Sequence, residues 1–496
     1  MKRFILYFTG LFFSASVFSY TPTPFNFHNY SVKHERTTLP TSYDSRDYDI
    51  ILPAKDQGRT NCCWAYTACH VAQAKFYKEN SKSGDLAPIV YVNCAKDLGF
   101  NYVDVNSGGN EGIANAMNCM LKTPVYQNRV PELTINTTEC PKYTKDDIHK
   151  YILSSSDLPE NDAIAIKKAI MEHGSVFSSV HYDDNYYSKS NNFYEYTGEN
   201  EPNHAISIIG WDDNKQAWLV KNTWGTYWGD EGCFWVSYDD SQISKKCTSW
   251  NEFVDTEDID EVYTYSKSNC TGSMGYEKPN IPLSILVAYE IKKGESLEYI
   301  STFIVNPDTK IQIAISYDGE NEPIYTWESE NIKYTGMYLH KLNEEIVSNG
   351  EAILVEICYT SPYKYAVPTE QSIENYNDIT LYDNQWISLN GEWVPVGKDS
   401  RDFRYNFVVY VYTKKQKSTT NLEENSALNN KVVFSDGKIN PEIWESAIQA
   451  TIFDVSGRNY GTIKPGGNIP TLNKGYYVLI IDMKDDTFVV EKFNIF

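Results

Sequence analysis

The chain has 496 residues and is strongly acidic, with 44 Lys and Arg against 66 Asp and Glu and a formal net charge of −22. This length exceeds what one hydrophobic core usually supports, so we expect several domains. Because nucleic acids and anionic membranes repel an acidic protein, the charge disfavours both as partners. It favours a soluble protein that works outside the cell or on its surface.

Residues 1–19 have the pattern of a secretory signal peptide. Lys2 and Arg3 precede an apolar stretch from Phe4 to Phe18, and Ser19 is a small residue suited to cleavage. The apolar stretch is short for a membrane anchor and polar residues follow it. We therefore predict an exported protein whose residues 20–38 form a short polar N-terminal lead.

Residues 39–252 mix helical and strand patterns. Apolar spacing predicts helices over 63–79 and 161–173. Apolar strand-like runs follow at 204–210, 217–221 and 233–238. A helical half followed by a β-rich half predicts an α+β domain.

Residues 253–413 show strand patterns alone, separated by clusters of Asn, Asp and Gly. This pattern favours an antiparallel β-sandwich. The expected strands cover residues 284–291, 299–305, 310–316, 352–359 and 403–412.

The last part of the chain reads as a linker followed by a small β domain. Residues 414–430 lack apolar periodicity, which is typical of a linker. Residues 431–496 contain two strand-and-turn stretches, 450–458 and 472–479.

One cysteine, one histidine and one asparagine carry the functional hypothesis. Cys63 precedes Trp64, His204 follows 141 residues after Cys63, and Asn222 comes 18 residues later. A thiol, an imidazole and an amide in this order can provide a nucleophile, its base and the group that orients the base. Taken singly, the cysteine would more often be a buried apolar residue and the histidine a structural one.

These residues stand in stretches that resemble the papain-like cysteine peptidases over about residues 39–250. A Cys-Trp motif with His and Asn far downstream is the signature of that family. The matching stretches are Leu39-Pro40, Lys55-Asp56-Gln57-Gly58, Cys63-Trp64-Ala65, Gly108-Gly109, Asn203-His204-Ala205 and Lys221-Asn222-Thr223-Trp224-Gly225. The resemblance implies a two-lobed peptidase domain with its active site between the lobes.

The resemblance also implies a role for each matched residue. Cys63 is the expected nucleophile, and as the first residue of a predicted helix its thiolate would be favoured by the helix dipole. The other implied roles are general acid and base for His204, orientation of its ring by Asn222, shielding of that bond by Trp224, oxyanion stabilisation by Gln57, and binding of an extended substrate by Gly108 and Gly109.

The cysteines follow the family pattern in part. The resemblance implies a disulfide between Cys94 and Cys140, whereas a second family bridge would need cysteines where Thr60 and Asn106 stand. Cys62, directly before the nucleophile, occupies a position that is usually small. The lead of residues 20–38 is also much shorter than the inhibitory propeptide of the family, so we expect any latency to come from elsewhere.

The regions after the peptidase domain have weaker resemblances. A β-sandwich at 253–413 resembles the lectin-like module of some bacterial papain-family proteins, although a structural spacer is as consistent with the pattern. Residues 431–496 resemble the C-terminal sorting domains of type IX secretion, which would indicate a Bacteroidota-type bacterium. The alternative for these residues is an ordinary small immunoglobulin-like domain.

We therefore predict a secreted or surface-exposed cysteine-type peptidase, in endopeptidase mode, that cleaves protein or peptide substrates through a Cys63 thioester. The alternative is a catalytically silent adhesin whose middle domain binds a glycan or host surface ligand. The C-terminal domain would engage the secretion machinery, and nucleic acid is not an expected partner. No Cys-x-x-Cys or His-x-x-x-His pair occurs in the sequence, so we expect no metal and no cofactor.

Overall fold

The computed structural model describes residues 20–35, 38–79, 84–320 and 322–416, and then 434–435, 438–439, 443–454, 458–467, 470–484 and 488–495. The predicted signal peptide, most of the predicted linker and residues 455–457 of the expected strand-and-turn stretch lie outside the described residues. The chain divides into two compact units, Met1–Lys415 and Gln416–Phe496. Each unit is described by itself.

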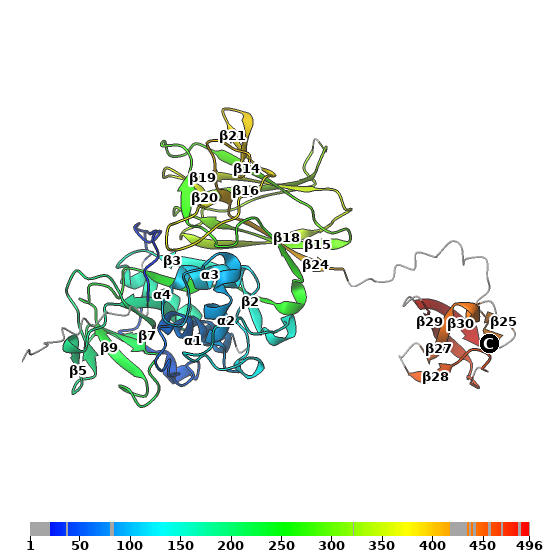
Figure 1. Cartoon of the computed structure of the whole chain (residues 1–496), viewed down its shortest axis with the longest axis horizontal. Coiled ribbons are helices and arrows are strands. Elements are labelled where there is room, and N and C mark those ends of the chain that lie inside the picture. Colours follow the sequence, from blue (N-terminus) through cyan, green and yellow to red (C-terminus); the bar gives the residue numbers. More distant parts are fainter. Residues whose placement is uncertain are drawn as a thin grey trace, which may run out of the picture. The chain divides into compact units, whose positions relative to one another are not determined.

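Three helices form the first layer of the N-terminal domain: α1 (Cys63–Lys78), α2 (Pro88–Asn93) and α3 (Glu111–Cys119) (Figure 1). Helix α1 is buried from Cys63 to Phe76, which is typical of a helix at the centre of a domain. Helix α3 is capped by Asn110, whose Oδ1 accepts from the backbone N–H of Ile113 at 3.1 Å. The sequence predicted the start of α1 and placed its end within one residue.

A sheet forms the second layer of this domain, in the order β3-β10-β4-β7-β8-β9-β6-β5, with β1 paired to β7. Helix α4 (Ala163–His173) packs against it, and Asp162 caps that helix by accepting from Ala165 N at 3.0 Å. The strands are β1 Ser42–Asp44, β3 Ser155–Leu158, β4 Val176–Val180, β5 Tyr187–Ser188, β6 Phe193–Tyr194, β7 His204–Asp212, β8 Ala217–Lys221, β9 Cys233–Ser237 and β10 Cys247–Trp250. The expected strands over 204–210, 217–221 and 233–238 correspond to β7, β8 and β9.

The middle β region has two main sheets that face each other across one apolar core. One sheet has the order β12-β24-β15-β18 and the other β17-β16-β19-β14-β21-β22, and a small sheet, β13-β20-β23, accompanies them. The strands are β12 Glu261–Tyr263, β13 Gly272–Met274, β14 Leu283–Tyr289, β15 Glu295–Ile304, β16 Lys310–Tyr317, β17 Tyr325–Glu328, β18 Gly336–Val347, β19 Ile353–Thr360, β20 Val367–Glu370, β21 Gln385–Leu389, β22 Glu392–Val396, β23 Asn406–Phe407 and β24 Val409–Lys415.

The single strand expected over 403–412 is wrong. The chain forms β23 in the small sheet and then β24 in a main sheet, so it changes partners at Val408. A run of apolar residues predicts extended backbone but says nothing about which neighbour each residue pairs with. Strand β24 also continues through Lys415, and thus includes two residues of the predicted linker.

The N-terminal domain and the middle β region pack together through a continuous apolar core. Strand β11 (Phe253–Asp255) pairs with β2 (Lys150–Ile152) and leads the chain out of the first domain. Across the contact, Asp157 N donates to Thr335 O at 2.9 Å and Tyr412 Oη donates to Cys119 O at 3.0 Å. In Figure 1 the sheet of β15, β18 and β24 lies next to α3 and β3. The middle region is therefore an integral part of the first unit.

The second unit contains a four-stranded antiparallel sheet in the order β28-β27-β29-β30. Its strands are β27 Ala447–Asp454, β28 Asn459–Ile463, β29 Gly475–Met483 and β30 Phe488–Ile495, beside the short pair β25 Phe434–Ser435 and β26 Lys438–Ile439. Alternate residues of β27 and β29 fill its core, among them Ile452 and Leu479. This agrees with the small β domain expected from the sequence.

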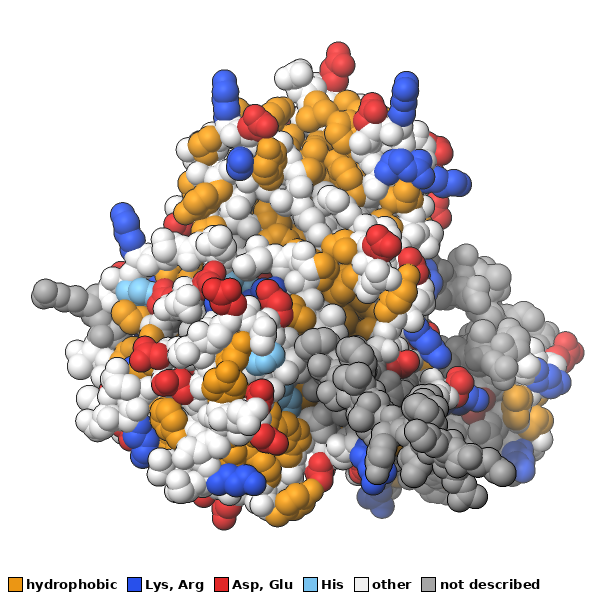
Figure 2. All heavy atoms as spheres, turned by 60° about the vertical axis from the view of Figure 1, so that its left-hand side comes forward, with side chains coloured by type: hydrophobic (Ala, Val, Ile, Leu, Met, Phe, Trp, Pro, Cys, Tyr) orange, Lys and Arg blue, Asp and Glu red, His pale blue; other side chains and the backbone are white. Residues whose placement is uncertain are grey.

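The surface carries charges of both signs. On the face shown in Figure 2, Asp and Glu side chains are interspersed with Lys and Arg side chains over both parts of the first unit. Among the described residues, no helix has the length and apolar character needed to span a membrane.

Because histidines are buried in this fold, we predict that its free energy of unfolding falls at acid pH. Burial lowers the pKa of His173, the last residue of α4, to about 3. Its unfolded pKa is near 6.5, so the unfolded chain binds the proton more readily, and stability is lost as the pH falls from about 6.5 towards 3. For His173 alone this linkage is worth on the order of 2 kcal/mol at pH 5.

We expect the urea midpoint, followed by tryptophan fluorescence, to fall between pH 7.5 and pH 5, and to fall less in a His173→Gln variant. The control is His181→Gln, since His181 lies in a more exposed position. An equal loss in all three proteins would contradict this origin of the acid sensitivity.

Candidate active site

The N-terminus of α1 meets the start of β7. Cys63 is the first residue of α1, and its Sγ accepts a hydrogen bond from the backbone N–H of Ala205 at 3.2 Å. Both residues are fully buried. The unsatisfied N–H groups at a helix N-terminus favour an anion, so this position favours a thiolate.

His204 is oriented by an amide. Its Nε2 lies 2.7 Å from Asn222 Oδ1, and that oxygen also accepts from Thr223 N. An amide oxygen accepts hydrogen bonds, so Nε2 carries a proton and Nδ1 is the ring nitrogen left for the thiol. The Trp224 ring stacks on the imidazole at 4.7 Å between centroids and covers it on one face.

Burial controls the protonation of this imidazole. His204 is 3% exposed, and desolvation lowers its pKa to about 4, against the opposing effect of the hydrogen bond to Asn222. With the cleft closed as it is here, the ring is therefore neutral near pH 7. A thiolate formed beside it, or water admitted to the cleft, would raise that pKa.

The Gln57 side chain is fixed by two hydrogen bonds. Its Nε2 donates to Thr60 O at 2.7 Å, and its Oε1 accepts from the Thr223 hydroxyl. Its side chain is therefore buried and held from two sides rather than lying on the surface. The second N–H of this amide has no hydrogen-bond acceptor among the described residues, so it can donate to a substrate oxygen.

Cys62 has an environment of its own. It precedes α1, is fully buried, and its Sγ contacts the carbonyl of Val105 at 3.8 Å. Desolvation, with Cys63 as a lesser cause, raises the pKa of Cys62 to about 12. A thiol with such a pKa stays protonated and unreactive near neutral pH.

The two glycines form a wall of the cleft for different reasons. Gly108 has a φ of +77°, a conformation that favours glycine over other residues. A Cβ on Gly109 would lie 2.4 Å from the Trp64 ring, so only glycine fits against that indole. The carbonyl of Gly109 accepts from Thr21 N at 3.1 Å, so the backbone of this wall pairs with an extended chain.

The disulfide pattern follows the resemblance. Cys94 and Cys140 form a disulfide bond. Where the second family bridge is missing, Asn61 Nδ2 donates to Asn106 O at 2.6 Å and Thr60 Oγ1 donates to Gln57 O at 2.8 Å. Hydrogen bonds thus connect the loop before α1 to the loop around Asn106.

The cleft is occupied by the start of the described chain. Tyr20 N donates to Asn203 O at 3.0 Å, and Thr21 N donates to Gly109 O at 3.1 Å. Asn110 Nδ2 in turn donates to Thr21 O at 2.9 Å. The lead therefore uses the backbone groups on both sides of the cleft, next to His204 and along the glycine wall.

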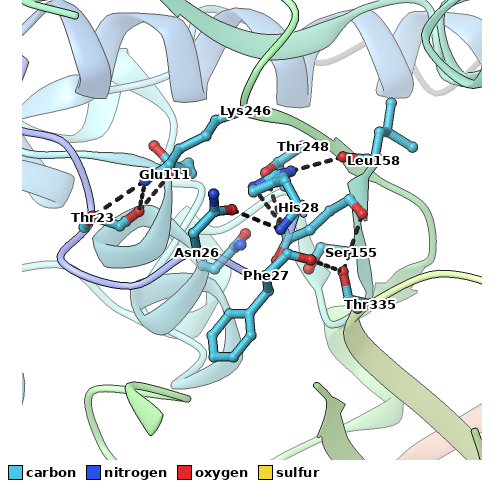
Figure 3. Close-up of polar contacts among 12 residues, drawn as sticks. Thr23, Asn26, Phe27, His28, Glu111, Ser155, Leu158, Lys246, Thr248 and Thr335 are labelled. Atoms are coloured by element: carbon cyan, nitrogen blue, oxygen red, sulfur yellow. Dashed lines mark hydrogen bonds and ion pairs between the residues drawn. The ribbon is translucent and has the colours of Figure 1, made fainter. Parts of the chain in front are cut away.

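The rest of this leading segment, residues 20–35, is held by both parts of the first unit (Figure 3). Lys246 Nζ donates to Thr23 O and Phe25 O, and Thr335 Oγ1 from the middle β region donates to Phe27 O at 2.8 Å. Farther along, His28 Nδ1 contacts Leu158 O at 2.9 Å. This role is not predictable from the sequence, because the segment has no periodicity and its partners lie far away in the chain.

A comparison with protein families supports the same interpretation. Residues 39–254 match the model described as papain family cysteine protease, so this part of the chain is a papain-family cysteine protease domain. The cathepsin L-like peptidase of Aedes aegypti is 27% identical over 206 residues, which cover 39% of this chain and 58% of that protein. The senescence-specific cysteine protease SAG12 of Arabidopsis thaliana is 27% identical over 234 residues, which cover 44% and 61%. The chain spans about three fifths of the length of these curated relatives.

A solved structure matches the fold beyond this domain. The cysteine protease and lectin-like domains of Cwp84, a surface layer associated protein of Clostridium difficile, align with a TM-score of 0.68 and 18% identity, over 78% of this chain and 90% of that one. This likeness shows a shared fold in which a largely β region follows a papain-like domain.

The contact between Gly109 and Trp64 predicts a specific sensitivity. In Gly109→Ala the new methyl group must displace the indole, so we expect the cleft wall to shift and unfolding to become easier by about 1–3 kcal/mol. Reaction of Cys63 with a peptide-like epoxide should slow by about tenfold or more, because small displacements are costly in a positioned site. The thermal midpoint and the rate of mass-adduct formation measure the two effects.

Gly84→Ala is the matched control, since a Cβ at that position meets only an ordinary contact with Tyr126 at 3.8 Å. If Gly109→Ala behaves like Gly84→Ala in both assays, the glycine wall does not depend on the indole.

Proposed function

We propose that this chain is an exported cysteine-type peptidase, in endopeptidase mode, with Cys63 as nucleophile, His204 as acid and base, and Asn222 as the group that orients the imidazole. The observation that carries the proposal is the hydrogen bond between His204 Nε2 and Asn222 Oδ1, with Cys63 Sγ at the adjoining backbone of Ala205. This is the arrangement in which one ring nitrogen is anchored and the other serves a thiol. The papain-family match of residues 39–254 supports it.

Acylation would begin with transfer of the Cys63 proton to His204 Nδ1. The thiolate then attacks the carbonyl carbon of the scissile bond, and the negative charge that develops on oxygen is stabilised by Gln57 Nε2 and the backbone N–H of Cys63. The proton on Nδ1 passes to the leaving nitrogen as the C–N bond breaks. The products of this half-reaction are an amine and a thioester on Cys63.

Deacylation would use the same groups in reverse. His204 Nδ1 accepts a proton from water, and the water oxygen attacks the thioester carbonyl. Collapse of the tetrahedral intermediate breaks the C–S bond, releases the carboxylic acid and restores Cys63. Trp224, stacked on the imidazole, keeps solvent away from the hydrogen bond to Asn222 during both half-reactions.

The leading segment would keep this peptidase latent. Residues 20 and 21 take the backbone positions on both sides of the cleft that a substrate needs. The neutral state of His204 in the closed cleft also disfavours an imidazolium partner for the thiolate. Latency would then be relieved by displacement or cleavage of this segment.

The remaining regions would serve export and support. The signal-like residues 1–19 and the Cys94–Cys140 disulfide support work in an oxidising location, outside the cell or on its surface. The contact from Thr335 to Phe27 supports a role for the middle β region in holding the leading segment. Glycan binding by that lectin-like region, and sorting through an immunoglobulin-like domain at 431–496, are hypotheses that rest on sequence resemblance.

The two adjacent cysteines provide the test of the proposed nucleophile. Cys63→Ser should lower peptide cleavage by at least about 10³-fold, because a serine hydroxyl is far less acidic than a thiol. The matched control Cys62→Ser should retain most activity, since the Cys62 thiol stays protonated. Cleavage of a casein-type substrate and the mass of the epoxide adduct give two independent readouts.

Loss of activity in Cys62→Ser with activity kept in Cys63→Ser would overturn the assignment. Absence of cleavage and of any adduct in the reducing, opened enzyme would instead favour the silent adhesin.

The leading segment makes a separate prediction about latency. Tyr20→Ala removes a fully buried side chain from the cleft, so the segment should detach more readily and Cys63 should react with the epoxide at least about tenfold faster. Addition of a synthetic peptide with the sequence of residues 20–35 should slow that reaction again.

Tyr102→Ala is the control, because Tyr102 is 49% exposed. Equal reaction rates for the unmodified chain, Tyr20→Ala and Tyr102→Ala would show that the segment does not restrict the cleft.

A further inference from the structure

Tyr20 fills a buried pocket beside the nucleophile that ends in a carboxylate. The Tyr20 side chain is fully buried, and its Oη donates to Glu111 Oε2 at 2.7 Å. Glu111 is itself only 4% exposed. Burial and the neighbouring Glu111 carboxylate both raise the pKa of Tyr20, so the phenol stays protonated and remains a donor. The pocket therefore encloses an aromatic ring, and Glu111 accepts a hydrogen bond from the hydroxyl group of that ring.

The backbone around this pocket is suited to a substrate. Asn203 O and Gly109 O accept from the N–H groups of residues 20 and 21, and they would accept equally from any extended peptide in the cleft. A substrate chain bound through these carbonyls would direct a side chain into the space that Tyr20 now fills. We propose that Glu111 is a specificity-determining residue that makes this pocket select a tyrosine side chain of the substrate. This inference rests on the proposed peptidase function.

The position of Glu111 explains why the carboxylate is tolerated there. Glu111 is the first residue of α3, where the helix dipole stabilises a negative side chain. Its other oxygen, Oε1, accepts from Thr23 Oγ1 at 3.4 Å, which also belongs to the leading segment. Glu111 has no ion-pair partner among the residues that the structure describes. Both hydroxyl donors are therefore lost when the leading segment leaves.

An unpaired buried carboxylate has a direct consequence for selectivity. A tyrosine in the pocket restores the lost hydrogen bond, whereas a phenylalanine buries the carboxylate without a donor. Sites that hydrogen-bond a substrate hydroxyl discriminate strongly against the analogue that lacks it. We expect tyrosine to be preferred over phenylalanine by about tenfold or more in kcat/KM.

The experiment compares fluorogenic peptides in matched sets of three. Within a set, the peptides differ only in one of the three residues before the cleaved bond, which is tyrosine, phenylalanine or lysine. The reference enzyme is the full chain with Tyr20→Ala, so that the pocket is open. In the set whose varied residue enters the pocket, the reference enzyme should cut the tyrosine peptide about tenfold faster than the phenylalanine peptide, and Glu111→Leu in the same background should bring that ratio to one or below. Glu111→Gln, which keeps an acceptor oxygen, should retain part of the preference.

Glu201→Gln serves as the charge control, because Glu201 is exposed near the cleft, and its selectivity should equal that of the reference. The ratio of two substrates on one enzyme is not changed by a loss of folded protein, so a merely structural role of Glu111 would not alter it. If the reference enzyme cuts the tyrosine and phenylalanine peptides of every set at equal rates, this inference is overturned but the proposed function is not. Faster cleavage of the lysine peptide than of the tyrosine peptide would also overturn this inference. It would mean that the Glu111 carboxylate selects a positive charge rather than a hydroxyl group. If no peptide is cut and Cys63 takes no epoxide adduct, the proposed function fails, and this inference with it.

Discussion

The contact between the start of α1 and the start of β7 is the constraint on which the rest of the structure depends. It brings the Cys63 thiol to the backbone of Ala205, which is 142 residues away in the sequence. His204, the residue directly before Ala205, belongs to the same strand end. Neither lobe contains a complete site, because helix α1 supplies the thiol, strand β7 supplies the imidazole, and the residue after β8 supplies the amide partner. The packing of helices against the sheet therefore determines the chemistry that the cleft can perform.

The same packing explains why the middle β region and the leading segment are part of one unit. The apolar core extends from the helical lobe to Tyr410 and Tyr412 on β24. The leading segment crosses this junction, with Tyr20 in the cleft and Phe27 bound to Thr335. A movement of the middle β region relative to the cleft would thus change its contact with the leading segment. The position of the middle β region would in this way affect the access of a substrate to the cleft.

Sequence reasoning succeeded where chemistry and local pattern coincide. The residues Cys63, His204 and Asn222 stand in short motifs, and the helix that begins at Cys63 has a clear apolar pattern, so their arrangement could be predicted. It failed where function depends on distant pairing. Tyr20 and Glu111 are 91 residues apart and neither stands in a motif, so their hydrogen bond was not foreseen. Strand β18 was missed as well, because its charged residues hide the alternation of buried side chains.

Once the cleft is open, Cys63 is expected to react as a thiolate paired with His204. An ordinary cysteine thiol has a pKa of about 8.5, so its alkylation rate rises mainly above pH 8. The most direct test is the rate of iodoacetamide addition to Cys63 from pH 4 to pH 10, in full-length Tyr20→Ala, resolved by peptide mass. Substantial reactivity is expected already between pH 5 and pH 7, and it should be lost when His204 is replaced by alanine. A profile that rises only above pH 8 and does not respond to His204→Ala would contradict it.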